Sequence, residues 1–163
     1  MYDATAGFVA KDYTCSKHNA PLRAIDFSTD NQFVRSNCNA YECLFYSAQD
    51  GEHIEQGGTR FRDVPWATES CVLTWACQGV GDDAACGDRS RGGDEMAVAT
   101  KAGGVKVFRF PAADAGKCES VGDARGHTHN VPSIGWSADD KRIYTVGGGD
   151  RAVMTWTTGP RKC

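Results

Sequence analysis

Residues 126–156 restrict the fold of this chain more than any other segment. They open with the pair Gly126-His127, and apolar residues then alternate with polar ones up to Trp136. A glycine-rich stretch closed by Asp150 follows, and a second alternating run ends at Trp156. Alternation with a period of two predicts half-buried strands, and the glycine and aspartate clusters predict tight turns. The segment is therefore expected to form a small antiparallel sheet.

The same residues resemble a blade of a WD40 propeller. A Gly-His pair, a strand ending in Trp-Ser-x-Asp at 136–139 and a later strand ending in tryptophan are typical of that repeat. The resemblance implies a structural role for His127, which would bond Asp150, and for Trp156, which would support the third strand. The hydroxyl partner is expected four residues before the aspartate, where Val146 stands, so this network is predicted to be incomplete. Because such blades usually serve as binding surfaces, the first hypothesis is a scaffold.

An earlier part of the chain repeats this pattern. His18 precedes His127, and Asp30 precedes Asp139, by the same offset of 109 (127 − 18 and 139 − 30). A third unit lies between these two, because residues 96–108 match the end of the last unit. The first repeat departs from the pattern at two positions.

In that first repeat, Tyr46 stands in place of the tryptophan and Ala40 occupies the position of the aspartate. Tyr46 and His18 are assigned to the structural network of this blade by the resemblance. Because alanine offers no carboxylate, His18 is predicted to lack its partner.

The chain is therefore predicted to be all-β, with about three to four four-stranded antiparallel blades that form part of a larger propeller. The expected parts of this partial propeller (1–163) are the end of a preceding blade at 1–14, a blade at 15–57, a blade with inserted loops at 58–122, and a last blade lacking its outer strand at 126–157. A blade takes about 40–45 residues, and closed propellers typically have four to eight blades. Since proteins avoid unpaired sheet edges, the rest of the propeller or a partner chain is expected to close the ring.

Period-two alternation also predicts the individual strands. They are expected at 22–27, 32–35, 41–46 and 53–56 in the first unit, at 71–75, 96–100 and 105–110 in the second, and at 131–136, 142–146 and 152–156 in the third. The polar, glycine-rich segments 79–83 and 87–94 are predicted to be exposed loops. Residues 7–13 are expected to form the outer strand of the preceding blade.

Charge and hydropathy exclude two classes of partner. The net charge of −3 and the pI near 5.8 argue against nucleic-acid binding. No stretch approaches the roughly 20 apolar residues of a membrane helix, so no membrane partner is expected. Contact with an acidic surface would need a local basic patch. The candidates for such an interaction surface are Arg60 with Arg62, Arg89 with Arg91, and the tail pair at 161–162, and the alternative for each is ordinary solvated charge.

Residues with reactive side chains do not form a recognisable catalytic or metal-binding pattern. The eight cysteines match no paired zinc spacing, and free thiols are favoured over a disulfide framework. The histidines are not spaced with carboxylates as metal ligands would be, and no serine or cysteine lies in a nucleophile elbow. The sequence therefore predicts no catalytic residues, no metal and no cofactor, and the chain is not expected to be an enzyme.

Beyond the general repeat, six segments resemble the C-terminal blades of the echinoderm microtubule-associated protein-like family. They are residues 15–18, 25–30, 35–46, 63–73, 104–111 and 126–156. The most specific is Trp-Ala-Thr-x-x-Cys-Val-Leu at 66–73. The resemblance implies a tandem pair of propellers, with this chain at the end of the second. It also implies association with tubulin or axonemal proteins, and a place in the cytoplasmic cytoskeleton or the ciliary axoneme.

The chain departs from that family in several respects. The family's coiled coil, basic region and hydrophobic motif of the first propeller are absent from it, so weak or no binding of tubulin is expected from this segment alone. Ala40 and the loop at 87–94 also differ from the family pattern. The alternative function is a general WD40 protein–protein adaptor with no link to tubulin.

Overall fold

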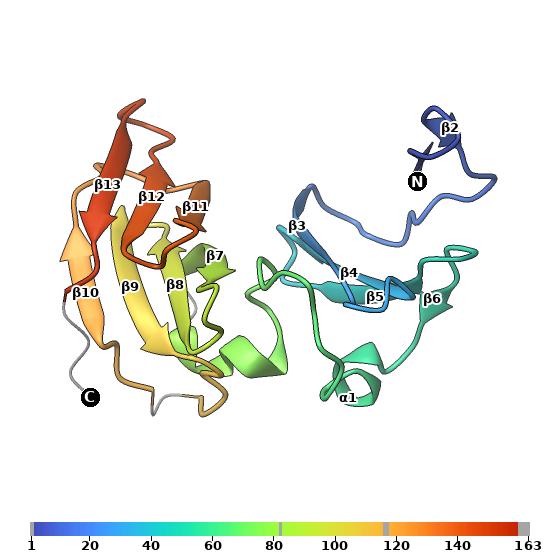
Figure 1. The fold of residues 1–163 in the computed structure, drawn as a ribbon, viewed down its shortest axis with the longest axis horizontal. Coiled ribbons are helices and arrows are strands. Elements are labelled where there is room, and N and C mark those ends of the chain that lie inside the picture. The colour runs from blue at the N-terminus through green and yellow to red at the C-terminus, as the bar shows by residue number, and fades with distance from the viewer. Residues whose placement is uncertain (1, 82, 116–117, 160–163) are drawn as a thin grey trace. The chain divides into compact units, whose positions relative to one another are not determined.

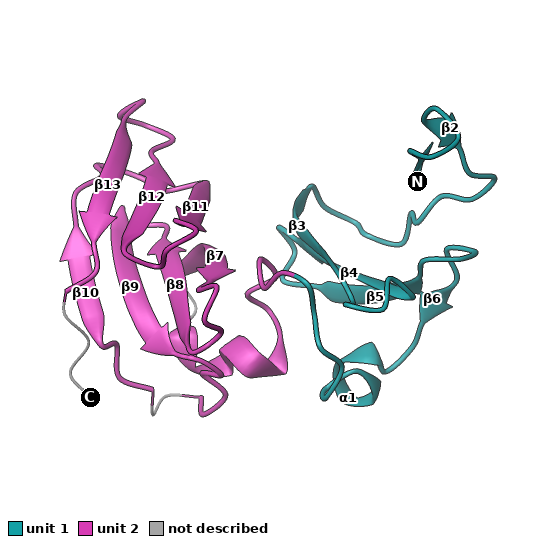
Figure 2. Cartoon of the chain, in the orientation of Figure 1, with its two compact units in different colours: residues 1–67 teal, residues 68–163 magenta. Residues whose placement is uncertain are grey.

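The computed structural model describes residues 2–81, 83–115 and 118–159 (Figure 1). The chain divides into two compact units, residues 1–67 and 68–163 (Figure 2). Both units are built from short antiparallel strands, as predicted for an all-β chain. None of the helices in the described ranges is long and apolar enough to span a membrane.

The first unit holds a hairpin of two short strands, a four-stranded sheet and one helical turn. Its elements are β1 (Tyr2–Asp3), β2 (Val9–Ala10), β3 (Leu22–Phe27), β4 (Phe33–Cys38), β5 (Cys43–Ser47), β6 (His53–Ile54) and α1 (Gly57–Arg60). The sheet order is β3-β4-β5-β6, a simple meander. The turn between β3 and β4 is tied by Ser28, whose hydroxyl donates to Asp30 Oδ1 at 2.5 Å and accepts the N–H of Phe33 at 2.9 Å. The strand at 22–27 and the turn after it were thus predicted correctly.

An aromatic cluster and a buried ion pair hold the first unit together. Phe45, Phe61 and Trp66 are buried against one another, with Phe45 and Trp66 ring centroids 6.0 Å apart. Arg35 Nε lies 3.0 Å from Asp26 Oδ2, and both side chains are nearly inaccessible. The Arg35 guanidinium also lies 4.3 Å from the centre of the Trp66 ring, a favourable cation–π arrangement.

The second unit contains two sheets. Its elements are a 3₁₀ helix (Trp75–Val80), β7 (Ala84–Arg89), β8 (Glu95–Thr100), β9 (Gly104–Arg109), β10 (Gly122–Arg125), β11 (Ser133–Trp136), β12 (Arg142–Val146) and β13 (Val153–Thr157). The four-stranded sheet has the order β10-β9-β8-β7, and the three-stranded sheet has the order β11-β12-β13. Every pairing in both sheets is antiparallel.

The two sheets of this unit pack face to face. Ala97 and Val105 of the first sheet are buried against Trp136 and Ile143 of the second. Asp88 fixes their alignment, because its Oδ2 accepts the backbone N–H of Trp136 at 2.8 Å and its carbonyl accepts the indole N–H at 2.9 Å. An aspartate inside β7 therefore serves to join neighbouring sheets.

The structure corrects the predicted start of the second unit. Residues 71–75 form no strand; Cys71 and Val72 are buried, and the 3₁₀ helix begins at Trp75. The first strand of this sheet is β7, which occupies part of the segment predicted to be an exposed loop at 87–94. A Cβ atom at Gly87 would overlap Met96 Cε and crowd Val72 Cγ1, so the strand needs small residues to lie against this core. The segment 79–83 is also no simple loop, since Val80 ends the 3₁₀ helix and is buried.

Candidate functional site

The last sheet is organised by four side chains that form one hydrogen-bonded chain. The indole Nε1–H of Trp156 donates to Thr145 Oγ1 at 2.8 Å, and Thr145 Oγ1 lies 2.7 Å from His127 Nε2. His127 Nδ1 lies 2.8 Å from Asp150 Oδ2. The predicted gap at Val146 is wrong: in β12 the inward-facing residues are Ile143 and Thr145, while Val146 faces outward. Thr145 supplies the hydroxyl.

Hydrogen-bond chemistry fixes the direction of this chain. An indole N–H can only donate, so the Thr145 hydroxyl accepts from Trp156. The Asp150 carboxylate can only accept, so a neutral His127 presents a protonated Nδ1 to it and accepts the Thr145 hydroxyl proton at Nε2. His127 then carries its proton on Nδ1 and donates it to Asp150. That bond makes the largest contribution to lowering the pKa of Asp150 below its usual value, and the hydrogen bond from the Ala152 N–H makes the next largest. Gly147 leaves room for the pair, because a Cβ there would overlap both Asp150 Oδ1 and His127 Nδ1.

The first unit repeats this arrangement with different partners. His18 Nε2 lies 2.7 Å from Ser36 Oγ, the counterpart of the threonine contact in the last sheet. Tyr46 lies opposite Val34 in the β4–β5 pairing, as Trp156 lies opposite Ile143. Burial makes the largest contribution to raising the pKa of the Tyr46 phenol above its usual value. The predicted lack of a carboxylate is only partly right, since Glu42 Oε2 comes within 3.5 Å of His18 Nδ1.

A third side chain joins His18 and Glu42. The Cys38 thiol lies 3.4 Å from Glu42 Oε2, and the ligand atoms of all three residues lie within 4.8 Å of one another. Sequence spacing gave no sign of this cluster, because His18 reaches the other two only through strand pairing. The seven cysteines within the described ranges are all thiols.

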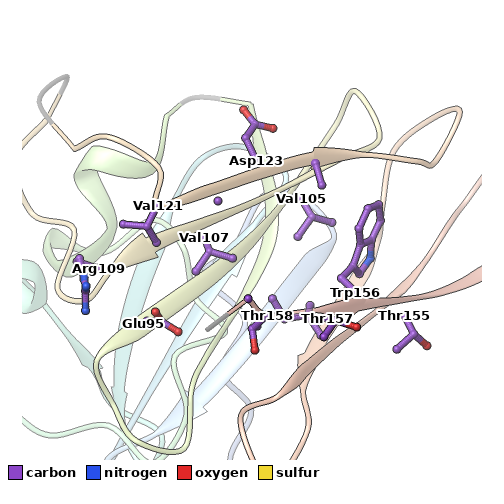
Figure 3. A pocket seen from close by; sticks show the side chains of 14 residues that line it. Glu95, Val105, Val107, Arg109, Val121, Asp123, Thr155, Trp156, Thr157 and Thr158 are labelled. Carbon is purple, nitrogen blue, oxygen red and sulfur yellow. The ribbon is translucent and has the colours of Figure 1, made fainter. Parts of the chain in front are cut away.

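The outer side of β13 forms an open edge. Within the described residues this strand pairs only with β12, whereas its neighbour sheet has a fourth strand, β10. A pocket of about 810 Å³ lies at this edge, between β9, β10 and β13 (Figure 3). Apolar side chains cover much of its wall, among them Val105, Val107, Val121 and Trp156.

The predicted basic pairs lie in different units. Arg60 and Arg62 are both exposed, at and just after the end of α1. Arg91 is exposed, but Asp140 accepts its backbone N–H at 2.7 Å and so places a carboxylate beside it. Arg89 is half-buried, with its guanidinium 5.6 Å from the centre of the Phe110 ring. The pair at 161–162 lies outside the described residues.

Comparison with known proteins decides the family. Residues 1–158 match the family described as the echinoderm microtubule-associated protein second beta-propeller. The chain belongs to the echinoderm microtubule-associated protein family. Its sheets are therefore propeller blades, in agreement with the antiparallel meanders described above.

Two curated relatives illustrate the family. The 77 kDa echinoderm microtubule-associated protein of Lytechinus variegatus is 31% identical over 153 residues, which cover 88% of this chain and 22% of that protein. The ciliary WD repeat-containing protein ctxp80 of Euplotoides octocarinatus is 29% identical, with 96% and 22% covered. The chain thus spans about a fifth of the length of these relatives. Among solved structures, the RRP9 WD40 repeats match 88% of this chain and 37% of theirs, at 14% identity and a TM-score of 0.45.

Proposed function

We propose that this chain is a non-catalytic scaffold segment of a propeller that associates with microtubules. The observation that carries the proposal is the open edge of β13 beside an apolar pocket, in a chain whose family relatives include proteins named for microtubule association. An unpaired edge with an apolar wall is a surface for another polypeptide. A ciliary relative supports a place in the cytoskeleton, including the axoneme.

The composition of the pocket supports binding over catalysis. Its lining is mostly valine, threonine and glycine, which carry no acid–base chemistry near neutral pH. Glu95 is one of its two carboxylates, and it lies directly opposite Arg109 in the β8–β9 pairing. The other, Asp123, projects from β10 (Figure 3). The residues that line the pocket in the described part of the chain include no histidine, cysteine or serine.

The same edge supports a role for a closing strand. The valines of β9 and the segment before β10 line the pocket together with residues of β13 (Figure 3). A strand supplied by the remainder of a propeller or by a partner chain would pair with β13 and cover these valines. Burial of that apolar area would favour the assembly, and the entropy lost on association would offset part of the gain.

Arg60 and Arg62 are the proposed contact for an acidic partner. The chain carries a net charge of −3, so attraction to an acidic surface depends on local positive clusters. Both side chains are exposed and adjoin one short helical turn. Arg91 is the weaker candidate because the Asp140 carboxylate lies next to its backbone.

Cosedimentation with assembled microtubules tests this function. Because only weak binding is expected from this segment alone, the chain should pellet with them partially and only at low ionic strength. Arg60→Glu/Arg62→Glu is expected to weaken that binding about three- to tenfold. The control Arg142→Glu/Arg151→Glu changes the net charge equally at two exposed arginines and should bind like the unmodified chain.

Two results would contradict the proposal. If the chain stays in the supernatant at every microtubule concentration, this segment has no tubulin contact of its own. In that case affinity capture dominated by proteins unrelated to microtubules would favour the general WD40 adaptor. If both double variants weaken binding equally, the contact is non-specific attraction and Arg60 and Arg62 are not its site.

A further inference from the structure

We propose that His18, Cys38 and Glu42 form a binding site for a borderline-soft divalent cation, with Zn²⁺ as the expected ion. The three side chains come from the segment before β3, the end of β4 and the turn before β5. Imidazole nitrogen, thiolate sulfur and carboxylate oxygen are the ligand types that zinc takes in proteins. Nitrogen and sulfur donors disfavour Mg²⁺ and Ca²⁺, which prefer oxygen.

The separations between the donor atoms fit one tetrahedral ion. With typical zinc–ligand distances, a nitrogen and an oxygen bound to the same ion lie about 3.4 Å apart, and a sulfur and an oxygen about 3.6 Å. The observed distances are 3.5 Å from His18 Nδ1 to Glu42 Oε2 and 3.4 Å from Cys38 Sγ to the same oxygen. Both separations match those of donors that share one zinc ion, and all three donor atoms lie within 4.8 Å of one another.

Hydrogen bonding alone does not account for His18. Its side chain is only 8% exposed, and Nδ1 is buried without a hydrogen-bond partner among the described residues. The 3.5 Å to Glu42 exceeds the 2.7–3.2 Å of an N–H···O bond. In the last sheet the corresponding nitrogen of His127 is satisfied by Asp150 at 2.8 Å. A buried ring nitrogen that has no hydrogen-bond partner and lies near a thiol and a carboxylate is available to bind a metal ion.

The surroundings of the three residues would hold such a site in shape. The other ring nitrogen of His18 lies 2.7 Å from Ser36 Oγ, so Nε2–H can donate there and leave Nδ1 as the ligand. This second hydrogen bond is the usual companion of a metal-bound histidine. Cys38 and Glu42 are tied to each other by the bond from the Cys38 N–H to the Glu42 carbonyl at 3.2 Å.

Access and protonation are also suitable. Cys38 is 2% exposed, but the Glu42 side chain is 35% exposed, so it leaves an entry path and room for a water molecule as fourth ligand. Binding replaces the thiol proton with a metal–sulfur bond and releases that proton to solvent. The bound ion would fasten the β4–β5 turn to the segment before β3 and so replace the missing aspartate contact of this sheet.

Metal titration of the complete reduced chain tests the site. Co²⁺ serves as the spectroscopic probe, and Zn²⁺ affinity is measured by competition with a chromophoric chelator. We expect one equivalent of Co²⁺ to produce a thiolate charge-transfer band that Zn²⁺ abolishes, with release of about one proton per ion. Cys38→Ser should lose the band. The control Cys15→Ser should retain it, because Cys15 lies outside the cluster, with its thiol 3.8 Å from the Gly51 carbonyl.

Two further variants test the metal site independently of whether Cys38→Ser folds. Glu42→Gln, at a partly exposed position, is expected to weaken Zn²⁺ affinity more than about tenfold and to lose the rise in Tm that Zn²⁺ gives the unmodified chain. Ser36→Ala is expected to weaken it about 10- to 100-fold through the orientation of His18. The proposal is overturned if no charge-transfer band forms, if the band survives in Cys38→Ser, or if Glu42→Gln binds Zn²⁺ as tightly as the unmodified chain.

Discussion

Removing the Thr145 hydroxyl isolates the hydrogen-bonded chain of the last sheet. Thr145→Val keeps the volume and shape of a fully buried side chain, so it opens no cavity. It leaves His127 Nε2, on a side chain that is 0% exposed, without its 2.7 Å partner. An unsatisfied buried group costs about 1–3 kcal/mol. The half-buried Trp156 indole loses a bond worth about 0.5–1.5 kcal/mol.

The expected loss in the free energy of unfolding is therefore about 1.5–4.5 kcal/mol, reduced by at most about 0.5 kcal/mol through the higher strand propensity of valine. Urea unfolding followed by tryptophan fluorescence and circular dichroism measures it. Thr155→Val is the matched control, because Thr155 is exposed on β13 and its replacement should change stability by less than about 0.5 kcal/mol. Equal stabilities of the two variants would refute the reasoning, since the hydroxyl would then carry no structural bond.

Three other outcomes follow from the structure. Arg35→Leu should cost about 3–5 kcal/mol of unfolding free energy in urea titrations, because it removes the buried ion-pair partner of Asp26. Asp26→Leu/Arg35→Leu should be no less stable than the single variant. The hydrogen bond from the Ser137 hydroxyl lowers the pKa of Asp139 in the folded state. The ionised Asp139 therefore stabilises the fold above its unfolded pKa, and this stabilisation is lost as the pH falls through the lower folded pKa. In Ser137→Ala the fall in stability measured below about pH 4 should be shallower. Sedimentation velocity should show that the 163-residue chain self-associates through its open edge, and a monodisperse monomer with a sharp unfolding transition would contradict this.

The sequence predicts the strands best where alternation and turn chemistry agree. Strands β3 and β12 match the predicted bounds, because each alternates and ends in a Ser/Asp or glycine turn. Strand β7 was missed because Ala-Ala-Cys-Gly-Asp-Arg lacks the β-branched and aromatic residues that mark a strand. Its glycine, Gly87, is required by Met96 and Val72, whose side chains leave no room for a Cβ atom there.

The networks were only partly predictable for a related reason. The spacing of four residues before Asp150 pointed to Val146 as the hydroxyl position. The alternation of buried and exposed residues in β12 places Thr145 on the inner face instead, so the sequence pattern did indicate the correct residue. The cluster of His18, Cys38 and Glu42 left no such signal. It depends on how the segment before β3 lies against the β4–β5 turn, which no spacing rule encodes.

The most direct test of a scaffold that needs a closing strand is hydrogen–deuterium exchange at the backbone amides of β13. In the chain at monomeric concentration, the amides of Val153–Thr157 that do not pair with β12 should exchange like those of an exposed loop, while those of the fully buried β8 (Glu95–Thr100) stay protected. Protection of β13 equal to that of β8 would mean that this chain covers its own edge. The last sheet would then need no further strand, and the proposed binding surface would not exist.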